Sequence, residues 1–178
     1  MNIAGNKISF SGEYMKRINE TDIQEILGAV QALHEAPFEY LAAVMQTEQP
    51  PLYEYVSAVE GNGLSDAERM VLLQGAVMGW HIVRETCGTG TIIDSEYLYN
   101  QLEENIDLLE ERDRDLGDFD EALFSVVDES AQPVLLGFLM DYVVEQQDEY
   151  DGAISDEVVP VIVLHLKTVI ESLLVDGQ

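Results

Sequence analysis

An acidic loop near the C-terminus has residue types that could bind calcium. The stretch QDEYDGAISDEV, residues 147–158, is centred on a glycine, as in an EF-hand loop, where the glycine stands at position 6 and oxygen ligands stand at 1, 3, 5, 7, 9 and 12. With Gly152 at position 6, position 1 is Gln147 and position 12 is Val158. Two main carboxylate positions are therefore lost, and we interpret the stretch as an acidic turn between two helices.

Two other acidic loops fail in the same way. With Gly90 at position 6, Glu85 and Glu96 stand at positions 1 and 12, but Cys87 and Thr89 are poor or neutral ligands for a hard cation. In RDRDLGDFDE, residues 112–121, an aspartate stands where the glycine is needed. The sequence thus predicts no metal site.

The histidines and the cysteine give little support for catalysis. His34, His81 and His165 lie on separate predicted helices and complete no Glu-x-x-His or HExxH pattern. Glu85 follows His81 by four residues on one helical face, which could hold a metal but favours a local hydrogen-bonded pair. Cys87 falls at the end of that helix, where the dipole disfavours a thiolate, so we expect it to be buried or unreactive.

These same three residues, His81, Glu85 and Cys87, mark the candidate pocket if the chain is a small-molecule binder or an enzyme. They include no paired, activated groups, so the sequence predicts no catalytic residue and no cofactor, and enzymatic activity is disfavoured.

Charge is the most unusual property of the chain. It has 35 Asp and Glu against 8 Lys and Arg, a formal net charge of −27, and no Lys or Arg from Asp115 to Leu166. Such a surface repels nucleic-acid backbones and anionic lipid, so direct binding to nucleic acid or membrane is excluded. It allows a basic partner. The plainer alternative is a surface of like charge that only keeps the chain soluble.

Carboxylates at three- and four-residue spacings form an acidic stripe on the helix expected from Ser95 to Arg112 and on the loop that follows it. We predict that this stripe is the partner-binding surface of a protein–protein interaction or regulatory module. The alternative is a nucleic-acid mimic that occupies the groove of a DNA-binding protein. The stripe consists of Glu96, Glu103, Asp107, Glu110, Asp113, Asp115, Asp118 and Asp120.

The elements that must position these residues are helices. Thr21 is a candidate cap for the first helix, with Leu33 on its buried face, and Ser65 with Glu68 forms a capping box for a long apolar helix. Pro37, Pro50 and Pro133 suit first turns of further helices, Gly88 and Gly90 are stop signals, and Asp94 or Ser95 is a cap. Leu98, Leu102, Ile106 and Leu109 form the expected buried stripe of the acidic helix.

The fold class that follows is all-α, a bundle or array of about eight helices packed as antiparallel hairpins. Residues 157–166 are rich in valine and could form a helix or a strand; we prefer a helix, because Asp156 can cap it and Pro160 falls in its first turn. Residues 1–18, including the strand-like KISFSG, are expected to form a flexible tail or an edge.

A shift of 62 residues aligns two glycine loops and suggests a duplicated helix-loop-helix unit. Gly75 then coincides with Gly137, Trp80 with Tyr142, and residues 65–111 with residues 127–173. Helix stop and start signals are common, so chance alignment explains the match about equally well. In either case residues 1–178 are expected to form a single helical domain.

A cytoplasmic location is expected from three observations. The start of the chain has no apolar core of a signal peptide, the apolar runs are shorter than the ~20 residues of a membrane helix, and the single cysteine, Cys87, forms no intramolecular disulfide. The helix from Val71 is apolar over most of its circumference. Its area could exceed what one chain covers, which leaves a homodimer open.

Overall fold

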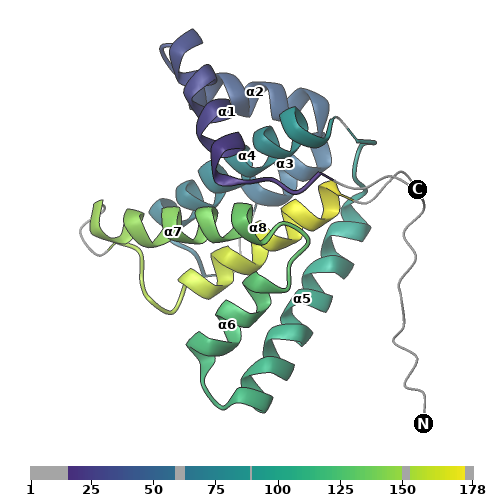
Figure 1. Cartoon of the computed structure of the whole chain (residues 1–178), viewed down its shortest axis with the longest axis vertical. Helices are drawn as coiled ribbons and strands as arrows, with labels where there is room; N and C mark the ends of the chain where they lie inside the picture. The colour runs from purple at the N-terminus through teal and green to yellow at the C-terminus, as the bar shows by residue number, and fades with distance from the viewer. Residues whose placement is uncertain (1–15, 59–62, 89, 150–152, 175–178) are drawn as a thin grey trace.

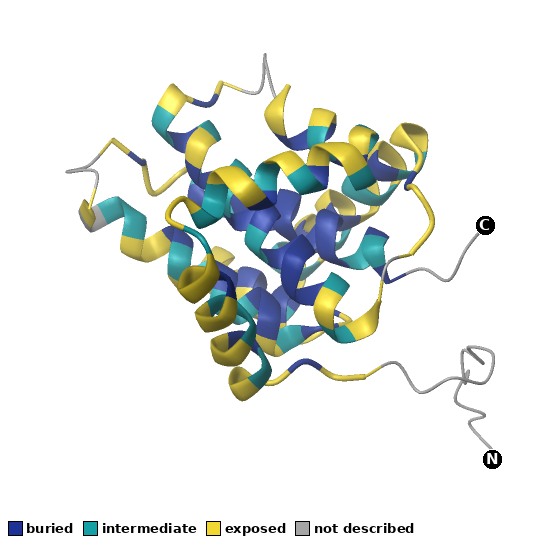
Figure 2. Ribbon diagram, turned by 90° about the horizontal axis from the view of Figure 1, so that it is seen from above, coloured by how far each residue is buried: buried dark blue, intermediate teal, exposed yellow. Residues whose placement is uncertain are grey.

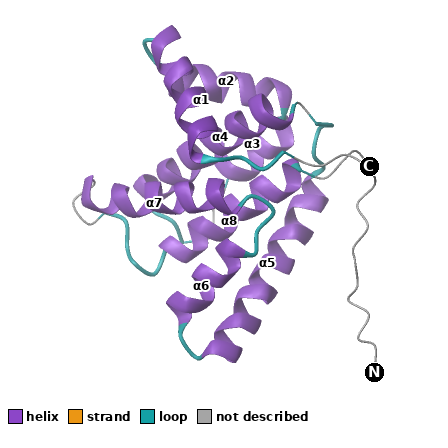
Figure 3. Ribbon diagram, in the orientation of Figure 1, coloured by secondary structure: helices purple, strands orange, loops and turns teal. Residues whose placement is uncertain are grey.

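The described part of the chain is entirely helical. The computed structural model describes residues 16–58, 63–88, 90–149 and 153–174, and within these ranges it contains eight α-helices and no strand (Figures 1 and 3). The all-α prediction is confirmed. The strand-like segment KISFSG and Asp151–Gly152 of the acidic loop lie outside the described residues. The helices are α1 (Glu20–Leu33), α2 (Pro37–Glu48), α3 (Pro50–Ser57), α4 (Asp66–Cys87), α5 (Ser95–Leu116), α6 (Phe119–Asp128), α7 (Pro133–Glu149) and α8 (Val159–Leu173).

Most helix starts follow the local signals. Pro37, Pro50 and Pro133 each stand at the start of a helix, where a missing backbone N–H costs nothing. Ser65 and Glu68 form the capping box of α4, and the Glu68 carboxylate also accepts the backbone N–H of Ser155 at 3.2 Å. Burial alone would raise the pKa of Glu68, but the hydrogen bonds from Ser65 and Ser155 lower it. The start of α4 therefore holds the segment that leads into α8.

Four local predictions are wrong. Asn19, not Thr21, caps α1, and its side chain accepts the backbone N–H of Asp22. Asp156 does not cap α8, because its carboxylate accepts a hydrogen bond from Gln147 and the helix begins three residues later with no side-chain cap. The acidic helix α5 continues past Arg112 to Leu116, where Gly117 in the left-handed conformation ends it. Leu33 is 77% exposed at the end of α1.

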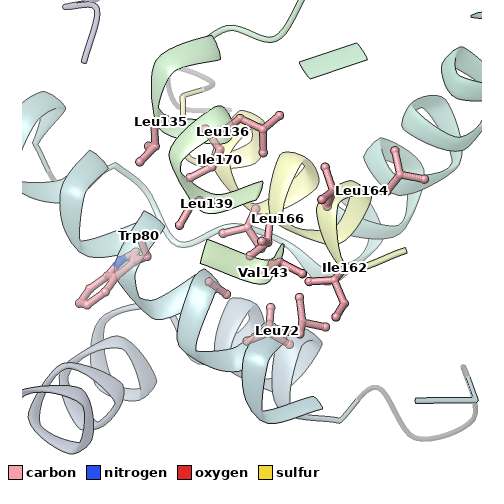
Figure 4. Close-up of a cluster of buried hydrophobic side chains, with 14 of the residues drawn as sticks. Leu72, Trp80, Leu135, Leu136, Leu139, Val143, Ile162, Leu164, Leu166 and Ile170 are labelled. Carbon is pink, nitrogen blue, oxygen red and sulfur yellow. The ribbon is translucent and has the colours of Figure 1, made fainter. Parts of the chain in front are cut away.

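Residues 157–166, which could have formed a strand, belong largely to α8, a central helix of the fold. It packs against α4, α5 and α7, and its side chains are mostly buried (Figure 2). Leu166 and Ile170 of α8 meet Leu139 of α7 and Leu72 of α4 in a cluster of buried aliphatic side chains (Figure 4). The contact with α4 is close because of glycine. A Cβ atom at Gly79 would lie 2.8 Å from Ile170 Cδ1.

The apolar helix α4 is covered within the chain by α1, α2, α3, α7 and α8. The apolar circumference that suggested a homodimer is thus used for intramolecular packing. Among the described helices, none combines the length and the apolar character needed to cross a membrane.

The suggested duplication would relate α4 and α5 to α7 and α8. The two glycines that it aligns differ in their surroundings: a Cβ at Gly75 would lie 3.1 Å from Leu166 Cδ2, whereas one at Gly137 would meet nothing within 4 Å. Trp80 is buried and Tyr142 is half-buried, with its hydroxyl donating to Gln74 at 2.5 Å. The duplication stays a prediction.

Candidate functional site

The predicted acidic stripe lies on the hairpin formed by α5 and α6. This hairpin reaches the end of the molecule opposite α1 and α2, and the turn between its helices is at the bottom of Figure 1. Seven of the eight stripe carboxylates are exposed and Asp113 is half-buried. Asp118 also has a structural role, because it caps α6 by accepting the backbone N–H of Glu121 at 3.1 Å.

The stripe keeps an excess of negative charge, although the exposed Arg114 stands between Asp113 and Asp115 in the last turns of α5. In the described ranges, none of its eight carboxylates forms an ion pair with a lysine or an arginine. Arg112 lies on the same hairpin but binds Glu129 through two hydrogen bonds of 3.0 and 2.8 Å. This pairing lowers the pKa of Glu129. The negative field of the hairpin therefore faces solvent.

Large apolar side chains are exposed on the same hairpin. Leu116 and Phe119 flank its turn at 44% and 43% exposure, and Phe124 on α6 is 57% exposed. Ile106, predicted to be buried, is 40% exposed. The surface thus combines carboxylates with apolar groups, as protein-binding surfaces often do.

Asn105 takes the buried position that we predicted for Ile106. Its amide nitrogen donates to Thr168 Oγ1 at 3.0 Å, and its oxygen accepts from Lys167 Nζ at 2.8 Å. Lys167, itself 4% exposed, also binds Glu171. The α5–α8 contact is therefore built around polar groups. Asn105 continues the heptad spacing of Leu98, Leu102 and Leu109, and this spacing was a usable signal that sequence reasoning missed.

A second buried polar contact adjoins this one. The Tyr55 hydroxyl lies 2.6 Å from His165 Nδ1, between α3 and α8. Burial lowers the pKa of His165 to about 4 and raises the pKa of Tyr55. Tyr99 of α5 packs edge-on against Tyr55 with ring centroids 5.7 Å apart. His165 is thus a buried residue whose lowered pKa favours the neutral form at neutral pH.

His81, Glu85 and Cys87 do not form a hydrogen-bonded group. His81 Nδ1 lies 3.9 Å from Glu85 Oε1, which is too long for the hydrogen bond that the i, i+4 spacing predicted. Glu85 instead accepts from Arg84 Nη1 at 2.6 Å. His81 is buried, which lowers its pKa. Cys87 is exposed rather than buried, and desolvation of its thiol raises the pKa, so the protonated form is favoured.

A cavity of about 270 Å³ lies close to these residues, but its walls are their neighbours. It is bounded by Glu48, Gln49, Trp80, Val83, Arg84, Gly88, Gly90 and Leu173. The Arg84 guanidinium forms a bidentate pair with Glu48, with both distances at 2.8 Å, and lies 5.6 Å from the centre of the Trp80 ring.

Gln49 fixes the loop at the rim of this cavity. Its amide nitrogen donates to the Thr91 carbonyl and its oxygen accepts the Ile93 N–H, both at 3.0 Å. The loop that looked like a degenerate calcium site is therefore held by a glutamine. In the part of the chain that the structure describes, no three His, Cys, Asp or Glu side chains are grouped closely enough to hold a metal ion.

Comparison of the chain with protein-family models, curated proteins and solved structures finds no match. A functional assignment therefore depends on the residues of this chain and their geometry.

Proposed function

We propose that the chain is a protein–protein interaction module that binds a basic partner on the α5–α6 hairpin. The observation that carries the proposal is the group of exposed carboxylates that form no ion pair with a lysine or an arginine in the described ranges, along α5 and at the turn where Leu116 and Phe119 are also exposed. Carboxylates steer a basic surface toward the hairpin, and apolar groups give the contact area that is retained at high salt.

The net charge supports a basic protein over other classes of partner. Nucleic acid and anionic lipid are repelled by −27 charges, whereas a basic surface is attracted. Because the single cysteine suits a reducing compartment, we expect the partner to be met in the cytoplasm.

The test is affinity capture from a lysate of the source cell, washed at about 500 mM salt and run with and without nuclease, because high salt removes proteins held by charge alone. Two variants with equal charge are compared with the native bait. The hairpin variant replaces exposed stripe carboxylates with their amides: Glu103→Gln, Asp107→Asn, Glu110→Gln and Asp115→Asn. The control variant replaces exposed carboxylates on α1, α2 and α7: Glu25→Gln, Glu39→Gln, Asp141→Asn and Glu145→Gln.

We expect one protein to be retained in stoichiometric amount by the native bait and the control variant and lost with the hairpin variant. Equal retention by both variants, or no retained protein, contradicts the proposal. If competitor DNA displaces the retained protein, the hairpin acts as a nucleic-acid mimic rather than as an ordinary docking surface.

A further inference from the structure

The cavity beside Arg84 lies where three helices end. Glu48 is the last residue of α2, Gly88 follows the last residue of α4, and Leu173 is the last residue of α8. These segments are far apart in the sequence, and the packing of α4 against α2 and α8 brings them together. The C-terminal end of a helix carries about half a negative charge and the N-terminal end about half a positive charge, so these three ends outweigh the one N-terminal end at the cavity, that of α3, whose N-cap residue is Gln49.

The charged side chains around the cavity also give it a net negative charge. Glu48 lines the cavity, and Glu85, which is not part of the lining, is also bound to Arg84, so two carboxylates face one guanidinium. Neither α2 nor α8 has a basic residue in its last turn. The cavity thus has an excess of negative charge, with Arg84 as the cation in its wall.

Arg84 is a poor site for an anionic ligand. Three of its five N–H groups already bind carboxylates, because Nε and Nη2 donate to Glu48 and Nη1 donates to Glu85. An anion at the two remaining N–H groups would lie close to both carboxylates. A ligand cation meets the opposite situation, because a carboxylate oxygen accepts more than one hydrogen bond and the helix-end carbonyls are acceptors as well.

We propose that this cavity binds a small organic cation with a primary ammonium or guanidinium group. Its volume of about 270 Å³ is roughly that of nine water molecules, which suits a short alkylamine better than a larger ligand. Trp80 gives the site an apolar wall for the alkyl part, and in Figure 4 its ring points away from the aliphatic side chains of α7 and α8. This site is separate from the hairpin, so the two proposals are independent.

The chain has a built-in reporter for this site, because Trp80 is its single tryptophan. The experiment titrates the full chain with agmatine in about 150 mM NaCl and follows tryptophan fluorescence and heat of binding. n-Butylammonium is the second cationic probe, and 1-butanol and acetate at matched ionic strength are the neutral and anionic probes. We expect saturable 1:1 binding of both cations, with no change for the other two.

Two variants locate the site and one controls for charge. Glu48→Gln should weaken binding at least tenfold, and Glu39→Gln, an exposed position on the same helix, should leave it unchanged. If Glu48→Gln fails to fold, Gly90→Leu is the second variant that tests whether the cation binds in this cavity. A Cβ at position 90 lies 3.7 Å from the Leu173 carbonyl on the cavity wall and meets nothing closer, so a leucine there should fill the cavity and abolish binding.

The proposal is overturned if agmatine gives no saturable change in Trp80 fluorescence, or if 1-butanol or acetate gives the same change. Equal weakening by Glu48→Gln and Glu39→Gln also overturns it, since binding would then follow net charge. Loss of partner capture by the hairpin variant changes none of these results.

Discussion

Gly79 lies where α4 meets α7 and α8, and a methyl group there has no room. A Cβ would be 2.8 Å from Ile170 Cδ1 and 3.0 Å from Leu139 Cδ1, and both side chains are fully buried. Replacing a mid-helix glycine with alanine gains about 1 kcal/mol of helix propensity, but overpacking a core costs about 1–3 kcal/mol. We therefore expect Gly79→Ala to lower the free energy of unfolding by about 1 kcal/mol, measured by urea denaturation.

Gly137→Ala in α7 is the matched control for this substitution. Its Cβ meets nothing within 4 Å, so only the propensity gain remains and the variant should be more stable than the native chain by about 0.5–1 kcal/mol. The packing argument fails if both alanine variants stabilise the chain equally.

His165 should make stability depend on pH. Its pKa is about 4 in the folded chain, against an ordinary value of 6.5. Below pH 6.5 the unfolded chain therefore binds a proton that the folded chain does not, and stability falls as the pH decreases from 6.5 toward 4. Between pH 7 and pH 5 this one group should account for a loss of about 2 kcal/mol.

The measurement is urea unfolding at pH 7 and pH 5 for the native chain and for His165→Asn. The side-chain oxygen of asparagine can still accept a hydrogen bond from the Tyr55 hydroxyl, but asparagine does not titrate. His81 and the carboxylates are present in both proteins, so the difference between their pH dependences isolates His165. An identical loss in the two proteins would show that His165 is already protonated, or exposed, in the folded state.

At the scale of elements, two buried glutamines connect loops to helix starts. Gln49 binds the Thr91 carbonyl and the Ile93 N–H. Gln132 is 1% exposed, donates to the Lys16 carbonyl at 3.0 Å and accepts the Ile18 N–H at 2.9 Å. Each residue directly precedes the proline that begins a helix, so a rigid helix start holds an extended segment by a pair of hydrogen bonds.

Hydrogen exchange tests this arrangement with each substitution as the control for the other. Gln49→Leu should speed exchange of the Ile93 amide and leave that of Ile18 unchanged, and Gln132→Leu should do the reverse. Loss of one hydrogen bond of about 1 kcal/mol corresponds to roughly a fivefold faster exchange of the amide that donated it. A rise at both amides in either variant would indicate global destabilisation instead.

The helix ends and the buried face of α5 show how much of the fold could be predicted from the sequence. Pro37, the Ser65–Glu68 capping box and Gly88 act within one turn of the chain, so they identified helix ends from local sequence alone. The inward face of α5 was less certain. The spacing of apolar residues predicted that Ile106 is buried. On α8, however, Thr168 and Lys167 face α5 and form hydrogen bonds with Asn105, so Asn105 is buried and Ile106 is exposed.

Of the two candidate sites, the sequence could predict the exposed stripe but not the cavity. The exposure of the acidic stripe could be expected, because carboxylates at helical spacing rarely become buried. The cavity could not be expected, because its walls are the ends of three helices that are distant in sequence. The residues predicted there were His81, Glu85 and Cys87, whereas the cavity is lined by their neighbours on α4, Trp80, Val83 and Arg84, and by Glu48, Gln49, Gly88, Gly90 and Leu173.

At the scale of the whole molecule, the dominant feature is charge repulsion within a compact fold. A net charge of −27 is spread over one chain of 178 residues, and only a few of the carboxylates are paired in the described ranges. Folding brings these charges closer together than they are in the unfolded chain, so repulsion lowers the free energy of unfolding. Salt screens this repulsion, because the Debye length falls from about 30 Å at 0.01 M to about 8 Å at 0.15 M.

We therefore expect the melting temperature to rise by several degrees between 10 and 500 mM NaCl, with most of the rise below about 200 mM. Tetramethylammonium chloride should give the same curve, because screening depends on ionic strength and a specific sodium site would not. The hairpin and control variants both reduce the net charge from −27 to −23, and since repulsion grows as the square of the charge, both should lose about a quarter of the rise. If only the hairpin variant loses this part of the rise in melting temperature, the repulsion is concentrated in α5 and α6 rather than distributed over the molecule.

A melting temperature that stays constant or falls with salt would contradict the prediction. It would mean that the ion pairs of Arg84 and Arg112, which salt weakens, stabilise the fold more than repulsion among the remaining carboxylates destabilises it.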